Sequence, residues 1–207
     1  MHPVLATQAA KIAGQLASVG QAEAQASPDP ANHAWSAQQV VEHLILAFEH
    51  SGNLLEESLK KRKSSPGSHT VAQWLLKAQI CWFGSMPRGV SALRALRPTA
   101  ITPQDGKTLA ARFLAAAEKL DLTLVACRKS FGLLPCAVHP IYGPLRVEEW
   151  RQYHAVHCSH HLPQLQTAIA HSPTHAELLH WPVPAPAAKT EDEPAHFTSK
   201  LVAVKRG

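Results

Sequence analysis

Residues 154–161 read His-Ala-Val-His-Cys-Ser-His-His, and no helix breaker interrupts the stretch before Pro163. If the stretch is helical, residues three and four apart lie on one face. His157 and His161 then stand one turn apart, which is the arrangement in which two imidazoles can bind one metal ion. The stretch therefore predicts a helix that supplies two metal ligands, with a third ligand coming from elsewhere in the fold.

Three neighbours of this pair differ in the helix face that they occupy. His154 lies one turn earlier on nearly the same face and Gln164 one turn later, whereas His160 is rotated well away. We expect His154 to line a pocket or to support the ligands. Gln164 is a candidate for orienting a ligand imidazole through its second ring nitrogen.

The composition favours a helical protein. Alanine and leucine are abundant among the 207 residues, aromatic residues make up only 6%, and runs of β-branched residues are scarce. The formal charge of +5 is mild, and the basic residues are dispersed apart from a run at residues 60–63. A short run of this kind at a helix end usually complements the helix dipole. We therefore expect one helical domain with extensions and no nucleic-acid partner.

The cysteines and the N-terminus bear on the compartment. The four cysteines lie far apart and lack the C-x-x-C spacing of zinc ribbons: Cys81, Cys127, Cys136 and Cys158. Residues 1–6 lack the basic and continuous apolar parts of a signal peptide, and no apolar run approaches the ~20 residues that span a bilayer. The expectation is a cytoplasmic protein with reduced thiols and no membrane partner.

Apolar residues recur at helical spacing along four long segments, at residues 5–19, 36–63, 102–129 and 147–171. A shorter apolar segment at residues 71–83 predicts one extra helix. We expect residues 1–171 to form an all-α four-helix bundle, a fold in which facing side chains of different helices can build a metal site. Residues 172–207, which are rich in proline and include an acidic run, predict an extended or weakly ordered tail.

Local signals mark where these helices begin and where one is weakened. Ser36 and Gln39 have the spacing of a capping box, and Thr102 followed by Pro103 is a helix-start signal. Pro163 removes one backbone hydrogen bond from the ligand helix and crowds the preceding turn. We therefore expect this helix to kink near the proposed ligands.

The third ligand is expected from the second long segment. The inward stripe of this segment consists, by spacing, of Val40, His43, Ala47, His50 and Leu54. His43 is the better ligand candidate, because it follows the capped start by about two turns, and His50 is expected to line a pocket or support the ligands.

Three imidazole nitrogens leave a tetrahedral ion with an open position, as in catalytic rather than structural zinc sites. Water, a thiolate or a carbonyl could bind at that position. Histidine alone does not select the metal. Zinc or nickel is expected first among the divalent transition metals, and iron or manganese second.

At these residues the sequence resembles the DinB/YfiT-like family of helical-bundle metalloproteins, whose signature is one histidine on an early helix and an H-x3-H pair on the last. Trp35-Ser36 and His43 match the first part, and residues 157–164 match the second. Residues 139–145 and Glu149-Trp150 look like a DinB-related branch of unassigned function.

The resemblance implies the four-helix fold and the ligand set of His43, His157 and His161. It also implies a range of activities, because members of known activity include transferases that use low-molecular-weight bacterial thiols and a thiol-dependent isomerase. Many other members have no established reaction, so the resemblance implies a site more firmly than a reaction.

The leading hypothesis is a metal-dependent enzyme that activates a thiol or water for transfer or hydrolysis of a small-molecule substrate, with a low-molecular-weight thiol as one candidate. The alternative is a non-catalytic helical bundle that binds metal structurally or forms a homodimer, because Pro163 weakens the ligand helix and no unmistakable catalytic acid or base is present. His139 and Tyr142 precede the last helix. They either border the pocket or belong to a loop that only fixes the entry angle of the chain.

Overall fold

The computed structural model describes residues 1–64, 67–87, 92–98 and 102–172. Within these ranges the chain forms six α-helices, two short 3₁₀ helices and one pair of strands. In chain order they are α1 (Pro3–Leu16), α2 (Gln21–Gln25), a 3₁₀ helix (Pro30–Asn32), α3 (Ala37–Lys61), α4 (Val71–Phe83), a second 3₁₀ helix (Arg94–Leu96), α5 (Gly106–Phe131), β1 (Ala137–His139), β2 (Gly143–Leu145) and α6 (Val147–Ala170).

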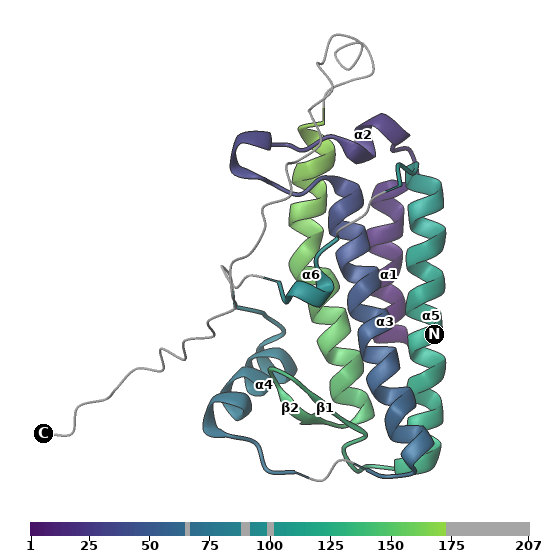
Figure 1. Cartoon of the computed structure of the whole chain (residues 1–207), viewed down its shortest axis with the longest axis vertical. Helices are drawn as coiled ribbons and strands as arrows, with labels where there is room; N and C mark the ends of the chain where they lie inside the picture. Colours follow the sequence, from purple (N-terminus) through teal and green to yellow (C-terminus); the bar gives the residue numbers. More distant parts are fainter. Residues whose placement is uncertain (65–66, 88–91, 99–101, 173–207) are drawn as a thin grey trace, which may run out of the picture.

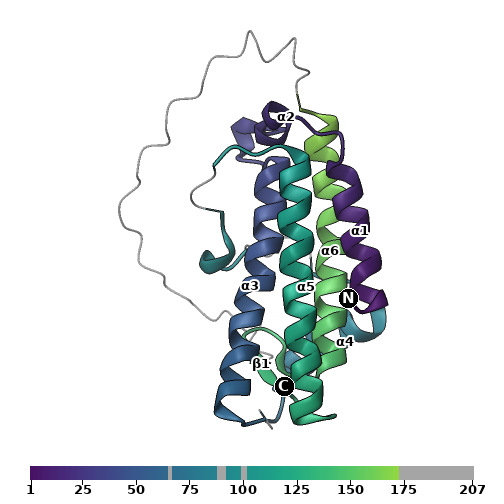
Figure 2. The same ribbon diagram turned by 90° about the vertical axis from the view of Figure 1, so that its right-hand side faces the viewer.

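Four long helices run alongside one another, as the two perpendicular views show (Figure 1, Figure 2). Helix α1 packs against α5 and α6, and α3 packs against the same two helices. Helix α2 lies across one end of this arrangement (Figure 1). The expectation of a mainly helical fold is confirmed.

Apolar side chains at helical spacing hold these helices together. Helix α1 buries one stripe and α5 another, which meet in a single core: Leu5, Ala9, Ile12 and Leu16 from α1, with Leu109, Phe113, Ala117, Leu120 and Leu124 from α5. At the end of α1 the backbones come unusually close, because the Gly106 amide donates to the Val19 carbonyl at 2.9 Å. A Cβ at residue 106 would lie 2.0 Å from the Leu16 carbonyl oxygen, so only glycine fits there.

The helix starts follow local side-chain chemistry. The capping box of α3 is confirmed, with the Gln39 amide donating to Ser36 Oγ and the Ser36 amide donating to Gln39 Oε1. The expected start of α5 at Thr102 is wrong, because Asp105 is the N-cap and its carboxylate accepts from the Thr108 amide at 2.7 Å. Thr102 instead presents its carbonyl to the side chain of Gln38 on α3.

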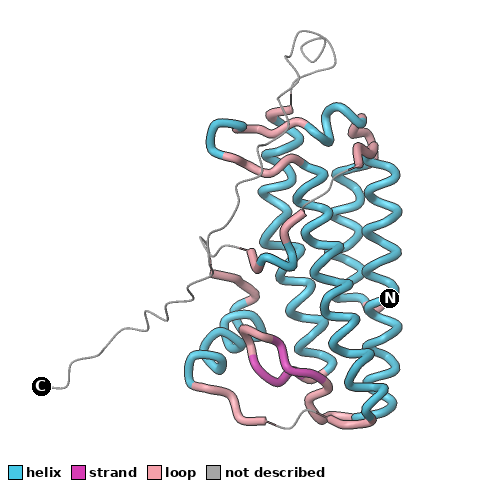
Figure 3. The backbone as a smooth tube through the Cα atoms, viewed as in Figure 1, coloured by secondary structure: helices cyan, strands magenta, loops and turns pink. Residues whose placement is uncertain are grey.

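A small antiparallel sheet occupies the segment expected to be a connecting loop. Strands β1 and β2 pair Ala137 with Leu145 and His139 with Gly143, and they lie between α4 and the long helices (Figure 3). Gly143 has a φ of +73°, which the tight turn requires and which glycine adopts without strain. The all-α expectation is therefore correct for the bulk of the fold and incomplete at this hairpin. Helix α2 and both 3₁₀ helices were likewise not predicted.

Two further expectations concern the end of the chain. Helix α6 continues through Pro163 to Ala170 without a break. Residues 173–207, which make up the expected tail apart from its first residue, lie outside the described residues, so the division of the chain at residue 171 stays a prediction. None of the described helices combines the length and the apolar character needed to cross a lipid bilayer.

Candidate metal centre

Three imidazoles from two helices converge at one point. His43 lies on α3, and His157 and His161 lie one turn apart on α6. One nitrogen from each ring lies within 4.8 Å of the others, and the three ring centroids are 4.8 to 5.0 Å apart. The fold thus brings His43 together with two histidines that lie more than a hundred residues further along the chain.

Local structure explains why these rings face one another. The capping box fixes the start of α3, so that His43 falls on its buried face, among the apolar residues of the core. Helix α6 lies against α3 and directs the i, i+4 pair towards His43. His43 and His157 are buried, whereas His161 is partly exposed and borders a cavity.

Hydrogen bonds fix the orientation of two of the rings. His43 Nδ1 lies 2.8 Å from the Leu96 carbonyl oxygen, which can only accept, so this nitrogen carries the proton. His161 Nδ1 lies 2.8 Å from Gln164 Oε1 and is protonated for the same reason. Nε2 consequently carries the lone pair in both rings, as is usual for metal-binding histidines that donate through the other nitrogen.

The distance between two of the candidate ligand nitrogens suits a shared ion. His43 Nε2 and His157 Nε2 are 3.1 Å apart. Two nitrogens bound to one tetrahedral zinc at the usual bond length would be about 3.3 Å apart. His157 Nδ1 is buried and has no hydrogen-bond partner among the described residues.

The electrostatic environment keeps these imidazoles neutral. Burial is the largest cause of a lowered pKa at all three histidines, and it is reinforced by the neighbouring imidazoles. The pKa of His161 falls to about 4, although its bond to Gln164 opposes the shift. Neutral imidazole is the form that binds a metal ion, so the site is prepared for a ligand role at neutral pH.

A cavity of about 510 Å³ adjoins the three histidines. Four of the five residues that the sequence marked as supporting or pocket residues line it: His50, His139, Tyr142 and Gln164. His154 does not line it and is fully buried, with its ring packed against Phe48 and Tyr153. The segment before α6 was expected either to border the pocket or only to fix the entry angle of the chain. His139 and Tyr142 both lie at the cavity wall, which agrees with the first interpretation.

The contacts of three residues at the site were missed by sequence reasoning, which named Trp35 only as part of the family signature. The Leu96 carbonyl that orients His43 belongs to a short 3₁₀ helix with no sequence signal of such a role. The Trp35 ring lies 5.1 Å from that of His43. Tyr153 stacks on His157 at 5.6 Å, and its position four residues before that histidine could have indicated the contact.

Comparison with known proteins identifies the family. Residues 21–168 match the model of the family described as "Protein of unknown function (DUF1569)", and the chain belongs to that family. The resemblance to the DinB/YfiT-like family is therefore wrong as an assignment, because the matched model belongs to a different family. The resemblance rested on a pattern of spaced histidines in this chain, which is too short to decide membership. Searches among curated proteins and among solved structures found no match.

Proposed function

We propose that this DUF1569 protein binds one divalent transition-metal ion through the Nε2 atoms of His43, His157 and His161. The observation that carries the proposal is the convergence of three neutral imidazoles, two of which have Nδ1 engaged by an acceptor. Unbound, the His43 and His157 nitrogens face each other at 3.1 Å, and a single hydrogen atom is all that can lie between them. A metal ion would instead engage all three lone pairs.

The chemistry follows from the number of ligands and from the cavity. Three protein nitrogens leave a tetrahedral ion with one open position, and the cavity gives a small molecule access to it. A bound ion would lower the pKa of a coordinated water or thiol and so provide a nucleophile for hydrolysis or transfer. Zinc and nickel suit an all-imidazole set best, and iron or manganese are the next candidates.

The cavity supports a small-molecule substrate. Its volume of about 510 Å³ lies within the usual range for ligand pockets, and its walls combine apolar side chains with histidine and tyrosine. A low-molecular-weight thiol fits the proposal, because a thiolate binds readily to zinc or nickel. We assign the scaffold to the four-helix-bundle class as part of the same proposal, with α1, α3, α5 and α6 as its helices.

Metal titration of the untagged protein tests the ligand set. Wild-type protein is expected to bind one cobalt or zinc ion per chain, and His157→Ala and His161→Ala are each expected to lose this binding. His171→Ala is the matched control, since it removes an exposed imidazole at the end of the same helix and should leave the stoichiometry at one. Equal binding by wild type and His157→Ala would falsify the proposal.

A second candidate function is a structural metal ion in a non-catalytic protein. The observation in its favour is that the three ligands belong to two different helices, so that a bound ion would crosslink α3 to α6. A structural ion is coupled to folding, and chelation should then lower the melting temperature sharply. A catalytic ion should be removable with the helical content intact, which circular dichroism before and after chelation would measure.

A further inference from the structure

A second polar position lies in the cavity wall, away from the three histidines. His139 ends strand β1, and its ring is buried among three aromatic rings, with centroids 4.6 Å from Tyr142, 4.6 Å from Tyr153 and 5.4 Å from Trp150. These contacts hold the imidazole in one orientation. His139 also lines the cavity that adjoins the proposed metal site.

The backbone of the hairpin fixes the position of the proton on this ring. His139 Nδ1 accepts from the Ile141 amide at 3.1 Å and from the Tyr142 amide at 3.3 Å. A nitrogen that accepts two N–H groups cannot itself carry a proton, so the proton of the neutral ring lies on Nε2. No partner for Nε2 is found among the described residues, and this atom is not one of the fully buried nitrogens that lack a partner. The Nε2–H group is therefore not fully buried, and it belongs to a ring that lines the cavity.

The ring stays uncharged at neutral pH. Burial, and to a smaller extent the neighbouring His50, lowers the pKa of His139 to about 3. A neutral imidazole with a fixed N–H is a hydrogen-bond donor for an oxygen that carries partial or full negative charge. Among the described residues that line the cavity there is no Asp, Glu, Lys or Arg. None of these residues therefore offers a charged group that would repel a ligand oxygen or bind it in place of His139.

A single aromatic ring connects this position with the metal ligands. Tyr153 is stacked on His157 with an interplanar angle of 20°, and it meets the ring of His139 at 63°. The ring centroids of His139 and His157 lie 4.6 and 5.6 Å from that of Tyr153, so both polar positions border the same ring and a short carbon chain that passes beside it can reach both.

We propose that His139 binds substrate by donating its Nε2–H to a carbonyl or carboxylate oxygen, and that the substrate class is a short thiol that carries such an oxygen at its other end. The thiol sulfur is held at the three histidines, so this inference rests on the proposed metal function. His139 then sets specificity, because a plain alkanethiol lacks the oxygen and cannot use the donor.

The test uses the full chain loaded with cobalt, whose visible spectrum reports thiolate binding. Wild-type protein is titrated with β-mercaptopropionic acid, its amide and propanethiol. The acid and the amide are expected to bind about tenfold more tightly than propanethiol, which is the effect of one hydrogen bond. His139→Phe keeps the ring packing and should abolish this preference while leaving the affinity for propanethiol unchanged.

Two controls separate the donor from its surroundings. His139→Gln retains an N–H donor and should keep part of the preference. Tyr142→Phe removes a hydroxyl from the cavity wall and should keep all of it. A preference of equal size in wild type and His139→Phe overturns the inference, and so does a preference that disappears in Tyr142→Phe alone.

Nitrogen NMR of the metal-free protein gives a readout that does not depend on cobalt. The Nε2-protonated form of His139 is expected, and a proton on Nδ1 overturns the inference. If the protein does not bind cobalt although His139 has the expected protonated form, the metal function is refuted, and the thiol class with it. If cobalt binds normally but the acid and the amide are not preferred over propanethiol, only the role of His139 is refuted.

Discussion

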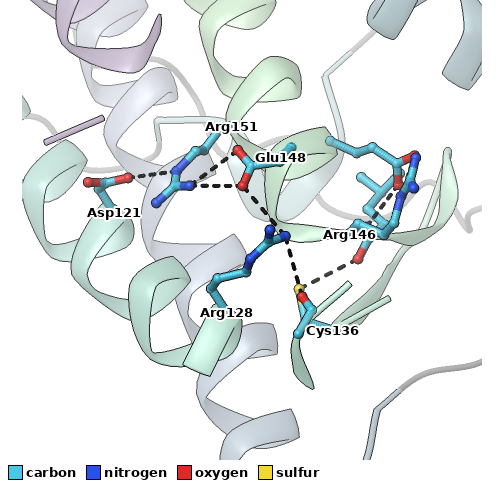
Figure 4. A network of polar contacts seen from close by, with 9 residues as sticks. Asp121, Arg128, Cys136, Arg146, Glu148 and Arg151 are labelled. Carbon is cyan, nitrogen blue, oxygen red and sulfur yellow. Dashed lines mark hydrogen bonds and ion pairs between the residues drawn. The ribbon is translucent and has the colours of Figure 1, made fainter. Parts of the chain in front are cut away.

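Helix α6 carries two polar clusters that differ in how completely their groups are paired. In one, Arg151 donates to Asp121 on α5 at 3.0 Å and to both oxygens of Glu148 at 3.2 Å (Figure 4). Asp121 also accepts from the His2 amide at the start of α1. In the other, one nitrogen each of His43, His157 and His161 converge, and the hydrogen bond between His43 and His157 pairs only two of the three. Paired charges hold three helices together, whereas the converging and incompletely paired nitrogens are the ligands of the proposed cation.

Breaking the paired cluster should have the largest effect on stability. Asp121→Ala leaves the guanidinium of Arg151 buried with Glu148 as its remaining partner among the described residues, and the loss of one member of a buried ion pair costs about 3–5 kcal/mol. Urea unfolding of the metal-free protein measures this loss. Metal stoichiometry should stay at one per chain wherever the variant is folded.

An exposed ion pair provides the control for that variant. Glu57 pairs with Lys60 and Lys61 on the surface of α3, where all three side chains are more than half exposed. Glu57→Ala is expected to change stability far less than Asp121→Ala. Equal losses from the two variants would mean that the buried pair contributes nothing beyond an ordinary surface contact.

The cluster of His43, His157 and His161 should stabilise the fold only when a metal ion is bound. Zinc at a hundred times its dissociation constant should raise the free energy of unfolding of the wild type by about 2.7 kcal/mol. His43→Ala removes one of the three converging nitrogens, so zinc should leave its stability unchanged. Thermal melts with and without zinc measure both quantities, and an equal zinc effect on both proteins would show that the ion binds elsewhere.

Much of the fold could be predicted because it depends on local pattern. The apolar stripes predicted the four long helices and the short helix at residues 71–83, and the capping box predicted the start of α3. The predicted start of α5 was three residues too early, because Thr102 and Asp105 are both possible cap residues. Asp105 forms the cap, whereas Thr102 contacts α3. The hairpin at residues 137–145 was missed because its strands are three residues long, which is too short for a strand pattern to be recognised in the sequence.

The site was predictable in part, for a physical reason. Spacing alone placed His157 and His161 on one face, and the stripe of α3 indicated His43 as the residue that meets them. Spacing carries no information about backbone carbonyls that reach the site from a distant segment, so the role of Leu96 could not be foreseen. Family membership was misjudged because the resemblance rested on a few spaced residues, whereas the family model compares most of the chain.

Acid should weaken the fold through histidines that are buried in the neutral form. His139 has a pKa of about 3 in the folded protein and about 6.5 when unfolded, so the unfolded chain binds more protons between these values. The stability that this group contributes is present above pH 6.5 and is lost as the pH falls towards 3. Between pH 7 and pH 5 the loss is about 2 kcal/mol for this one histidine.

Urea unfolding of metal-free wild type and His139→Phe at the two pH values isolates this contribution. The variant lacks the titrating group, so its stability should fall by about 2 kcal/mol less than that of the wild type over the same interval. Parallel losses in the two proteins would show that His139 is protonated in the folded state at pH 5.

The smallest effect is expected at His154, which lies between the two clusters on α6 and belongs to neither. Both of its ring nitrogens are buried without a partner among the described residues, and burial holds its pKa well below the usual value. His154→Phe replaces these nitrogens by apolar atoms of similar shape within an aromatic environment, so the free energy of unfolding should rise by about 1 kcal/mol. Cobalt affinity should not change, because His154 contributes no nitrogen to the converging set. A variant that is destabilised, or that binds cobalt more weakly, would mean that His154 supports His157 and that the second cluster extends one turn further along α6 than the three histidines.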